Sequence, residues 1–136
     1  MTSSLIDSTD LTPAERLIIA RRRDGMTQDD YAAWWGVERD RYKRWESGRY
    51  EPDAIVLIGQ LEAHEECFLL RRRGKITRRD LADDLGVSLT WLTLMERGRV
   101  PVDRLFTHWS QNLDLAGIVD RIKRRKAARR RRRRSR

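Results

Sequence analysis

The 136-residue sequence has little of several residue types, and each scarcity excludes a class of protein. Cys67 is its one cysteine, so no disulfide can form within the chain and a reducing compartment is expected. His64 and His108 are the only histidines, and with Cys67 they form no ligand set at a known metal-binding spacing. No apolar run approaches the roughly 20 residues that a membrane-spanning helix needs. Neither a metal site nor a membrane span is predicted.

The sequence also lacks the residue patterns of an enzyme. It holds no nucleophile beside a general base and no Gly-rich phosphate loop, and its carboxylates are scattered. No catalytic activity, cofactor or small-molecule ligand is predicted. Residues 1–10, MTSSLIDSTD, are expected to form an N-terminal arm. They lack the basic region followed by an apolar one that a secretory signal has.

Charge is distributed unevenly along the chain. The net charge is +9, but residues 121–136 hold 12 of the 30 Lys and Arg and none of the 21 Asp and Glu. The first 120 residues therefore carry a net charge of −3. The sequence describes a slightly acidic body with a strongly basic C-terminal segment.

An internal repeat covers most of the acidic body. A shift of fifty residues aligns 11–60 with 61–110 without a gap, and 14 aligned positions are identical. Apolar character is kept at helical spacing, as in Tyr42 against Leu92 and Trp45 against Met95. The same core is therefore predicted twice, in a first domain at 11–60 and a second, divergent domain at 61–112, followed by a C-terminal segment at 113–136.

Each copy is predicted to hold four short helices and no strand, so the fold class is all-α. Capping signals such as Thr12-Pro13-Ala14-Glu15 mark the helix starts. The fourth helix of the first copy is expected to start near Asp53, with Ile55, Val56 and Ile58 on its apolar side. The expected ranges are about 12–23, 27–35, 38–47 and 53–60 in the first copy, and 62–73, 78–85, 88–97 and 102–111 in the second.

The second and third helices of each copy are predicted to pack at a steep angle across a tight turn. Ala32 allows the helices to approach closely, and Gly36 permits the turn. The inward residues are expected to be Tyr31, Trp35, Val37, Tyr42 and Trp45 in the first copy, and Leu81, Leu85, Val87, Leu92 and Met95 in the second.

The stretch TQDDYAAWWGVERDRYKRWESGRYEPD resembles the helix-turn-helix domain of the Cro/C1 (XRE) repressor family. The matching features are the Thr-Gln opening, Ala32 five positions after Thr27, Gly-Val at the turn, Trp-Glu-x-Gly and the Pro that follows. The later stretch ITRRDLADDLGVSLTWLTLMERGRVP is similar to the same domain in its core and less so on its surface. The resemblance implies two tandem lambda repressor-like domains.

The resemblance also implies that the third helix enters the major groove of double-stranded DNA. It places Arg39, Asp40 and Arg44, with Lys43 beside them, where family members contact base edges. Arg can bond guanine O6 and N7 together, and Asp can accept from cytosine N4. The resemblance implies phosphate contact at Gln28, Arg49 and Tyr50. A solvated helix face is the alternative interpretation.

The second copy carries a different outward surface. Leu89, Thr90 and Leu94 occupy its reading positions, with Trp91 beside them, and such apolar groups indicate a covered surface. One interpretation is a protein interface, with a second copy or another protein, through Leu89, Trp91 and Leu94. Another is weaker DNA contact, with thymine methyls at the apolar groups and phosphates at Arg78, Arg79 and Arg99. Packing within the chain is the third.

The C-terminal segment is predicted to start as a helix and end without structure. Apolar residues recur at helical spacing at Leu113, Leu115, Ile118, Val119 and Ile122, so a helix is expected from about Asp114 into KRRKAA. The following arginines cannot bury apolar surface and are predicted to be disordered when free. They are expected to bind nucleic-acid phosphates without reading sequence: Arg129, Arg130, Arg131, Arg132, Arg133 and Arg134. A solubility tail or an RNA-binding run are the alternatives.

These features together favour a sequence-specific transcription regulator. The resemblance implies a repressor or switch regulator of a phage or mobile element, working as a dimer in the cytoplasm on the nucleoid, or in the host cytoplasm if phage-encoded. Two alternatives stay open. One is an adaptor or antagonist that binds another regulator or RNA polymerase through the second copy. The other is an architectural nucleic-acid-binding protein that depends on the basic segment.

Overall fold

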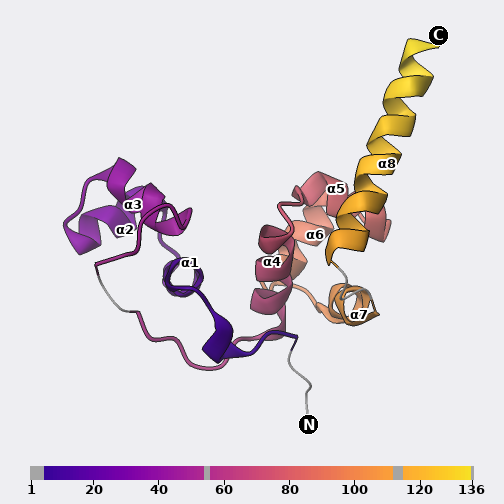
Figure 1. The fold of residues 1–136 in the computed structure, drawn as a ribbon. Coiled ribbons are helices and arrows are strands. Elements are labelled where there is room, and N and C mark those ends of the chain that lie inside the picture. The colour runs from indigo at the N-terminus through magenta and orange to yellow at the C-terminus, as the bar shows by residue number, and fades with distance from the viewer. Residues whose placement is uncertain (1–4, 54–55, 112–114, 136) are drawn as a thin grey trace. The chain divides into compact units, whose positions relative to one another are not determined.

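The computed structural model describes residues 5–53, 56–111 and 115–135, and all secondary structure in those ranges is helical (Figure 1). The predicted all-α fold class is confirmed. The chain divides into two compact units, one from Ile6 to Leu61 and one from Glu62 onward that also takes in Leu5. None of the described helices combines the length and the apolar character that crossing a lipid bilayer requires.

The first unit contains a short 3-10 helix, η1 (Ser8–Asp10), and three α-helices: α1 (Pro13–Arg23), α2 (Gln28–Trp35) and α3 (Arg39–Glu46). The predicted capping box opens α1, because the Thr12 hydroxyl accepts from the Glu15 amide at 3.1 Å and the Glu15 carboxylate accepts from the Thr12 amide at 3.0 Å. The Thr27 hydroxyl caps α2 by accepting from the Asp30 amide. The first three helices expected in this copy are therefore present.

The core of the first unit lies between α1 and the α2–α3 pair. Tyr31, Tyr42 and Trp45 are buried together with Leu17 and Ala32, and Trp35 and Val37 pack partly buried against them. Gly36 ends α2 with φ +67°, a backbone conformation that a residue with a Cβ adopts only at a cost. The expected inward residues and the expected turn are thus in place.

The prediction of a fourth helix in the first unit is wrong. Residues 56–59 have no regular secondary structure, and Leu57 is 85% exposed. Ala54 and Ile55 lie outside the described residues. The physical reason is visible at the aligned position of the second copy, where Gly59 is replaced by Trp109. Trp109 is fully buried and anchors a helix, whereas Gly59 offers nothing to bury and destabilises a helix this short.

The second unit repeats the three-helix arrangement and extends it. Its helices are α4 (Ala63–Arg73), α5 (Arg78–Leu85), α6 (Leu89–Glu96), α7 (Asp103–Gln111) and α8 (Leu115–Arg134). α4 packs on α6 and α7, and α5 packs on α6. Gly86 ends α5 with φ +76°, as Gly36 ends α2. The residues buried here include Leu81, Leu92, Met95, Leu105 and Trp109, all at 0% exposure.

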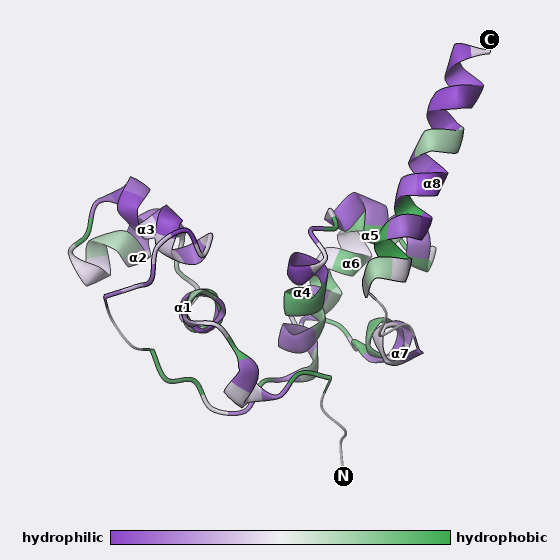
Figure 2. Ribbon diagram, viewed as in Figure 1, coloured by the Kyte–Doolittle hydropathy of each residue, from purple (hydrophilic) through white to green (hydrophobic). Residues whose placement is uncertain are grey.

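The C-terminal arginine run is helical, so the predicted disorder is wrong. α8 continues without a break through Arg134, and Figure 2 shows most of its outer part as hydrophilic. Arginine is a good helix former, and extending an existing helix avoids the cost of nucleation. Ile118 and Ile122 are buried near its start, as expected. Leu113 and Asp114 lie outside the described residues.

Candidate nucleic-acid interface

A buried carboxylate holds the inner side of α3. Glu46 is 3% exposed and accepts two hydrogen bonds from the Arg21 guanidinium, at 2.6 and 3.1 Å. It also accepts from the Gln28 amide at 3.0 Å and from the Tyr42 hydroxyl. Burial and the hydrogen bond to Glu46 raise the pKa of Tyr42. This network joins α1, α2 and α3, and so fixes which side of α3 faces outward.

The outward side of α3 carries the charged residues expected to read bases. Asp40 and Arg44 are exposed, and Lys43 is half-buried beside them. Arg39 lies at the edge of this face, where its guanidinium is 3.0 Å from the Asp29 carboxylate on α2. Both side chains of that pair are more than half exposed, so the interaction contributes little and can be exchanged for another anion.

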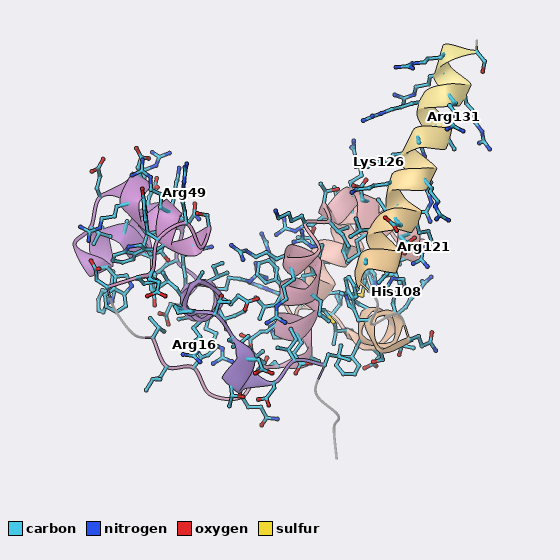
Figure 3. The ribbon with its side chains drawn as sticks, in the orientation of Figure 1. Arg16, Arg49, His108, Arg121, Lys126 and Arg131 are labelled. Carbon is cyan, nitrogen blue, oxygen red and sulfur yellow. The ribbon has the colours of Figure 1, made fainter. Side chains whose placement is uncertain are left out.

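Arg44 also contacts the segment after α3. Its guanidinium lies 5.8 Å from the centre of the Tyr50 ring, and Tyr50 is 54% exposed. Arg49 is exposed next to it and is labelled in Figure 3. Arg44, Arg49 and Tyr50 therefore lie close to one another.

One flank of α3 is acidic. A hollow beside the helix is lined by Arg41, Arg44, Trp45, Tyr50 and four carboxylates, those of Glu38, Asp40, Glu51 and Asp53. Arg41 is paired with Asp53 there. Four carboxylates repel phosphate, so this flank disfavours the phosphate contact that the resemblance implies for Tyr50, and the flank of Arg39 and Lys43 is more favourable to a nucleic-acid backbone.

Gln28 lies where the resemblance implies phosphate contact, but its amide is used inside the unit. It bonds to Glu46 at 3.0 Å. Its counterpart Arg78 does the same in the second unit, with its guanidinium 3.4 Å from Glu96. Arg79 and Arg99 are exposed in the second unit. Of the three arginines expected on phosphates in this copy, only Arg78 is therefore held by a buried partner.

The second unit repeats the carboxylate network, which the sequence prediction missed. Glu96 is 1% exposed and accepts from Arg71 at 2.7 and 3.0 Å. Arg71 also donates to the carbonyl of Ile76 at 3.0 Å, as Arg21 does to that of Met26. The signal was available in the alignment, because an Arg and a Glu 25 residues apart are present in both copies.

The outward side of α6 is apolar in part. Leu89 is 44% and Trp91 45% exposed, and Thr90 between them is exposed as well. Leu94 is half-buried, so the apolar surface is smaller than predicted. A helix turns about 100° per residue, which puts Leu89 and Trp91 on opposite edges of this face. Trp91 and Leu94 therefore lie about 60° apart around the helix, whereas Leu89 lies more than about 100° from both, so the three residues do not form one compact patch.

The clearest electrostatic feature of the second unit joins α5 to α8. Asp84 has a side chain 2% exposed and accepts from Arg121 at 2.9 and 2.6 Å and from Arg125 at 2.7 Å. Burial alone would raise the pKa of Asp84, but the hydrogen bonds from both arginines outweigh it and the pKa lies below its usual value. His108 on α7 lies 3.4 Å from the same carboxylate.

Two further carboxylates of α5 extend this contact along α8. Asp80 pairs with Lys126 at 2.6 Å, and Asp83 pairs with Arg129 at 3.2 Å. The pKa of Asp80 is lowered because hydrogen bonds from Lys126 and Thr77 outweigh its burial. Figure 3 labels His108, Arg121 and Lys126 along this contact. No role was predicted for these acids from the sequence.

The end of α8 beyond these ion pairs is entirely cationic. The side chains from Arg130 to Arg134 are exposed. One side of the helix is a basic stripe with a small residue in it, formed by Lys123, Lys126, Ala127, Arg130, Arg131 and Arg134. The arginines expected to bind phosphates are therefore exposed, and they are displayed on a helix.

No group of three or more His, Cys, Asp or Glu in the described residues could hold a metal ion. Cys67 is fully buried, and burial raises the pKa of its thiol to about 12, which leaves it unreactive. Comparisons with protein-family models, with curated proteins and with solved structures found no match.

Proposed function

We propose that this protein is a sequence-specific DNA-binding transcription regulator whose first unit reads the major groove. The observation that carries the proposal is the division of α3 into two sides. Tyr42, Trp45 and Glu46 are buried on one side, and Asp40 and Arg44 are exposed on the other. A short helix whose buried side is fixed, and whose exposed side carries guanidinium and carboxylate groups, suits base-edge recognition.

The proposal includes a role as a repressor or switch regulator, in line with the resemblance to Cro/C1-type proteins. Arg44 is the residue best placed to read a base, because it is exposed and stands beside Tyr50 and Arg49. The arginines of α8 would add affinity for any duplex without adding specificity.

Selection of bound sequences from a pool of random duplexes tests the proposal. The wild type should enrich one sequence, and Arg44→Ala should bind that sequence about 1–3 kcal/mol more weakly while binding random DNA nearly as before. Arg16→Ala, on α1, is the control for loss of a positive charge. A wild type that enriches no sequence contradicts the proposal.

A second candidate function is an adaptor that binds a protein through α6. The half-exposed Leu89 and Trp91 favour it, since a DNA-reading helix gains more from polar groups at those positions. A second copy of this chain is the partner that also suits a DNA-binding regulator, because dimers place two reading helices on one operator.

A further inference from the structure

Two of the three carboxylates of α5 that pair with α8, Asp83 and Asp84, belong to the second copy of the repeat alone, whereas Asp80 has its counterpart in Asp30. In the fifty-residue alignment, Asp83 and Asp84 stand where the first copy has Ala33 and Trp34. Trp34 is 70% exposed, so the corresponding side of α2 is uncovered within its own unit. Asp84 is covered by Arg121 and Arg125 of α8. In the second copy this side of α5 therefore binds a basic helix. We call its carboxylates Asp80, Asp83 and Asp84 the seat of α8.

The seat fixes the direction of α8 as well as its position. Ile118 and Ile122 are buried at 1% and 6% exposure. The ion pairs then continue from Arg121 through Lys126 to Arg129, which spans more than two helical turns. Because these contacts are spread along α8, the helix cannot rotate about any single one of them.

The helix continues past this seat with charge of one sign. Arg130 to Arg134 are exposed, and within the described residues the structure shows no ion pair to any of them. Consecutive helical residues are about 100° apart, so five arginines in a row surround the helix. Figure 3 shows Arg131 on this outer part. This end of α8 therefore presents guanidinium groups on all sides of the helix.

We propose that the second unit is a mount that holds α8 as a rigid cationic helix, whose Arg130–Arg134 end lies in the major groove of double-stranded DNA. The inference rests on the proposed function, which makes duplex DNA the ligand. The major groove of B-form DNA is wide enough for an α-helix, and arginines around the helix reach phosphates on both of its edges. The major groove of A-form RNA is deep and narrow, which favours DNA over RNA.

The mount differs physically from a flexible arginine tail. Both would release counterions and lose affinity with salt. A flexible tail loses conformational entropy when it binds, whereas a mounted helix is already ordered. The two accounts therefore predict different effects for variants that change the order of α8 without reducing its charge.

The first experiment removes the seat in the full chain. Asp83→Asn with Asp84→Asn raises the net charge from +9 to +11. Asp103→Asn with Asp120→Asn raises it equally in the same unit, at exposed positions outside these ion pairs. Affinity for a random duplex of about 30 bp is measured at fixed salt. The mount predicts that the Asp83/Asp84 variant binds about tenfold more weakly than the control pair. A flexible tail predicts equal binding, and tighter than wild type for both.

The second experiment breaks the helix and keeps every charge. Ala127→Pro removes a helical hydrogen bond in the exposed part of α8, and Ala127→Ser is the matched control. The mount predicts about tenfold weaker binding by the Pro variant than by the Ser variant. This pair decides the question even if the Asp83/Asp84 variant fails to fold.

The outcomes separate the two proposals. A wild type that binds no duplex DNA overturns both. A wild type that binds DNA, with the Pro variant equal to the Ser variant, overturns the mount and leaves the proposed function intact. Equally tight binding of wild type to an RNA duplex of the same length overturns the placement in the major groove.

Discussion

Arg21 and Glu46 are joined by two hydrogen bonds, at 2.6 and 3.1 Å, between α1 and the last turn of α3. Arg71 and Glu96 form the same pair in the second unit. Each pair spans 25 residues and ties the first helix of a unit to its third. The outward face of α3 or α6 can therefore vary while the inner attachment stays unchanged.

Removing the carboxylate charge of Glu46 should destabilise the first unit strongly. Glu46→Gln leaves Arg21 without its charged partner, and loss of one member of a buried pair costs about 3–5 kcal/mol. The free energy of unfolding is measured in urea by tryptophan fluorescence. Asp53→Asn is the control, because it breaks the exposed pair with Arg41 and should cost less than about 1 kcal/mol. Similar losses in the two variants would show that burial of the Glu46 pair has no energetic consequence.

Gly36→Ala should destabilise the first unit by about 1–2 kcal/mol, because φ is +67° there and a Cβ disfavours that conformation. Gly59→Ala is the control. A Cβ at Gly59 meets nothing within 4 Å and its φ lies outside the left-handed region, so it should be neutral or slightly stabilising. Thermal unfolding of the two variants gives the comparison. A Gly36→Ala variant as stable as wild type would rule out strain at this turn.

The second unit should lose stability as the pH falls below about 6.5, the ordinary pKa of histidine. Burial lowers the pKa of His108, although Asp84 opposes the shift and Arg121 adds to it. The unfolded chain then binds a proton that the folded chain resists, so the loss is at most about 1.4 kcal/mol per pH unit. His108→Gln should flatten the dependence between pH 7.5 and 5.5, measured by urea unfolding. His64 is present in both proteins, so equal slopes would exclude His108 as the cause.

Leu89→Asp with Trp91→Asp should convert a dimer to a monomer if α6 is the interface between two copies. Two charges on the apolar edges of the helix would be desolvated on association. Light scattering of the folded variant measures the change. Leu57→Asp introduces a charge at an 85% exposed leucine of the first unit and should leave the mass unchanged. A monomeric wild type would contradict the interface.

The helices of both units could be predicted because local signals agreed with one another. Thr12, Thr27 and Thr77 cap helices, and Gly36 and Gly86 end them, as short-range rules require. The repeat doubled the information, since each core position could be checked against its partner. Base-reading and partner roles at Arg39, Asp40, Lys43, Arg44, Leu89 and Trp91 stay predictions.

Several of the missed features depend on contacts that are distant in sequence. The Asp84 carboxylate meets Arg121 across 37 residues, and no local pattern marks either as a partner. Disorder was predicted for the arginine run from its composition, whereas the run continues a helix whose earlier part is paired with α5. The prediction of a fourth helix in the first unit was wrong because of one residue. Gly59 has no side chain to bury, whereas the side chain of Trp109 is fully buried.

The first unit ends in a segment without a helix. Residues 56–59 belong to no helix, and the second unit begins shortly after them at Glu62, so only a few residues separate two units that each carry their own core and their own buried Arg–Glu pair. If both units bind one duplex, as the two proposals require, binding of one unit holds the other at an effective concentration on the order of millimolar. Two contacts of modest strength would then combine into a long-lived complex, and lengthening the junction would weaken that complex without altering a single binding residue.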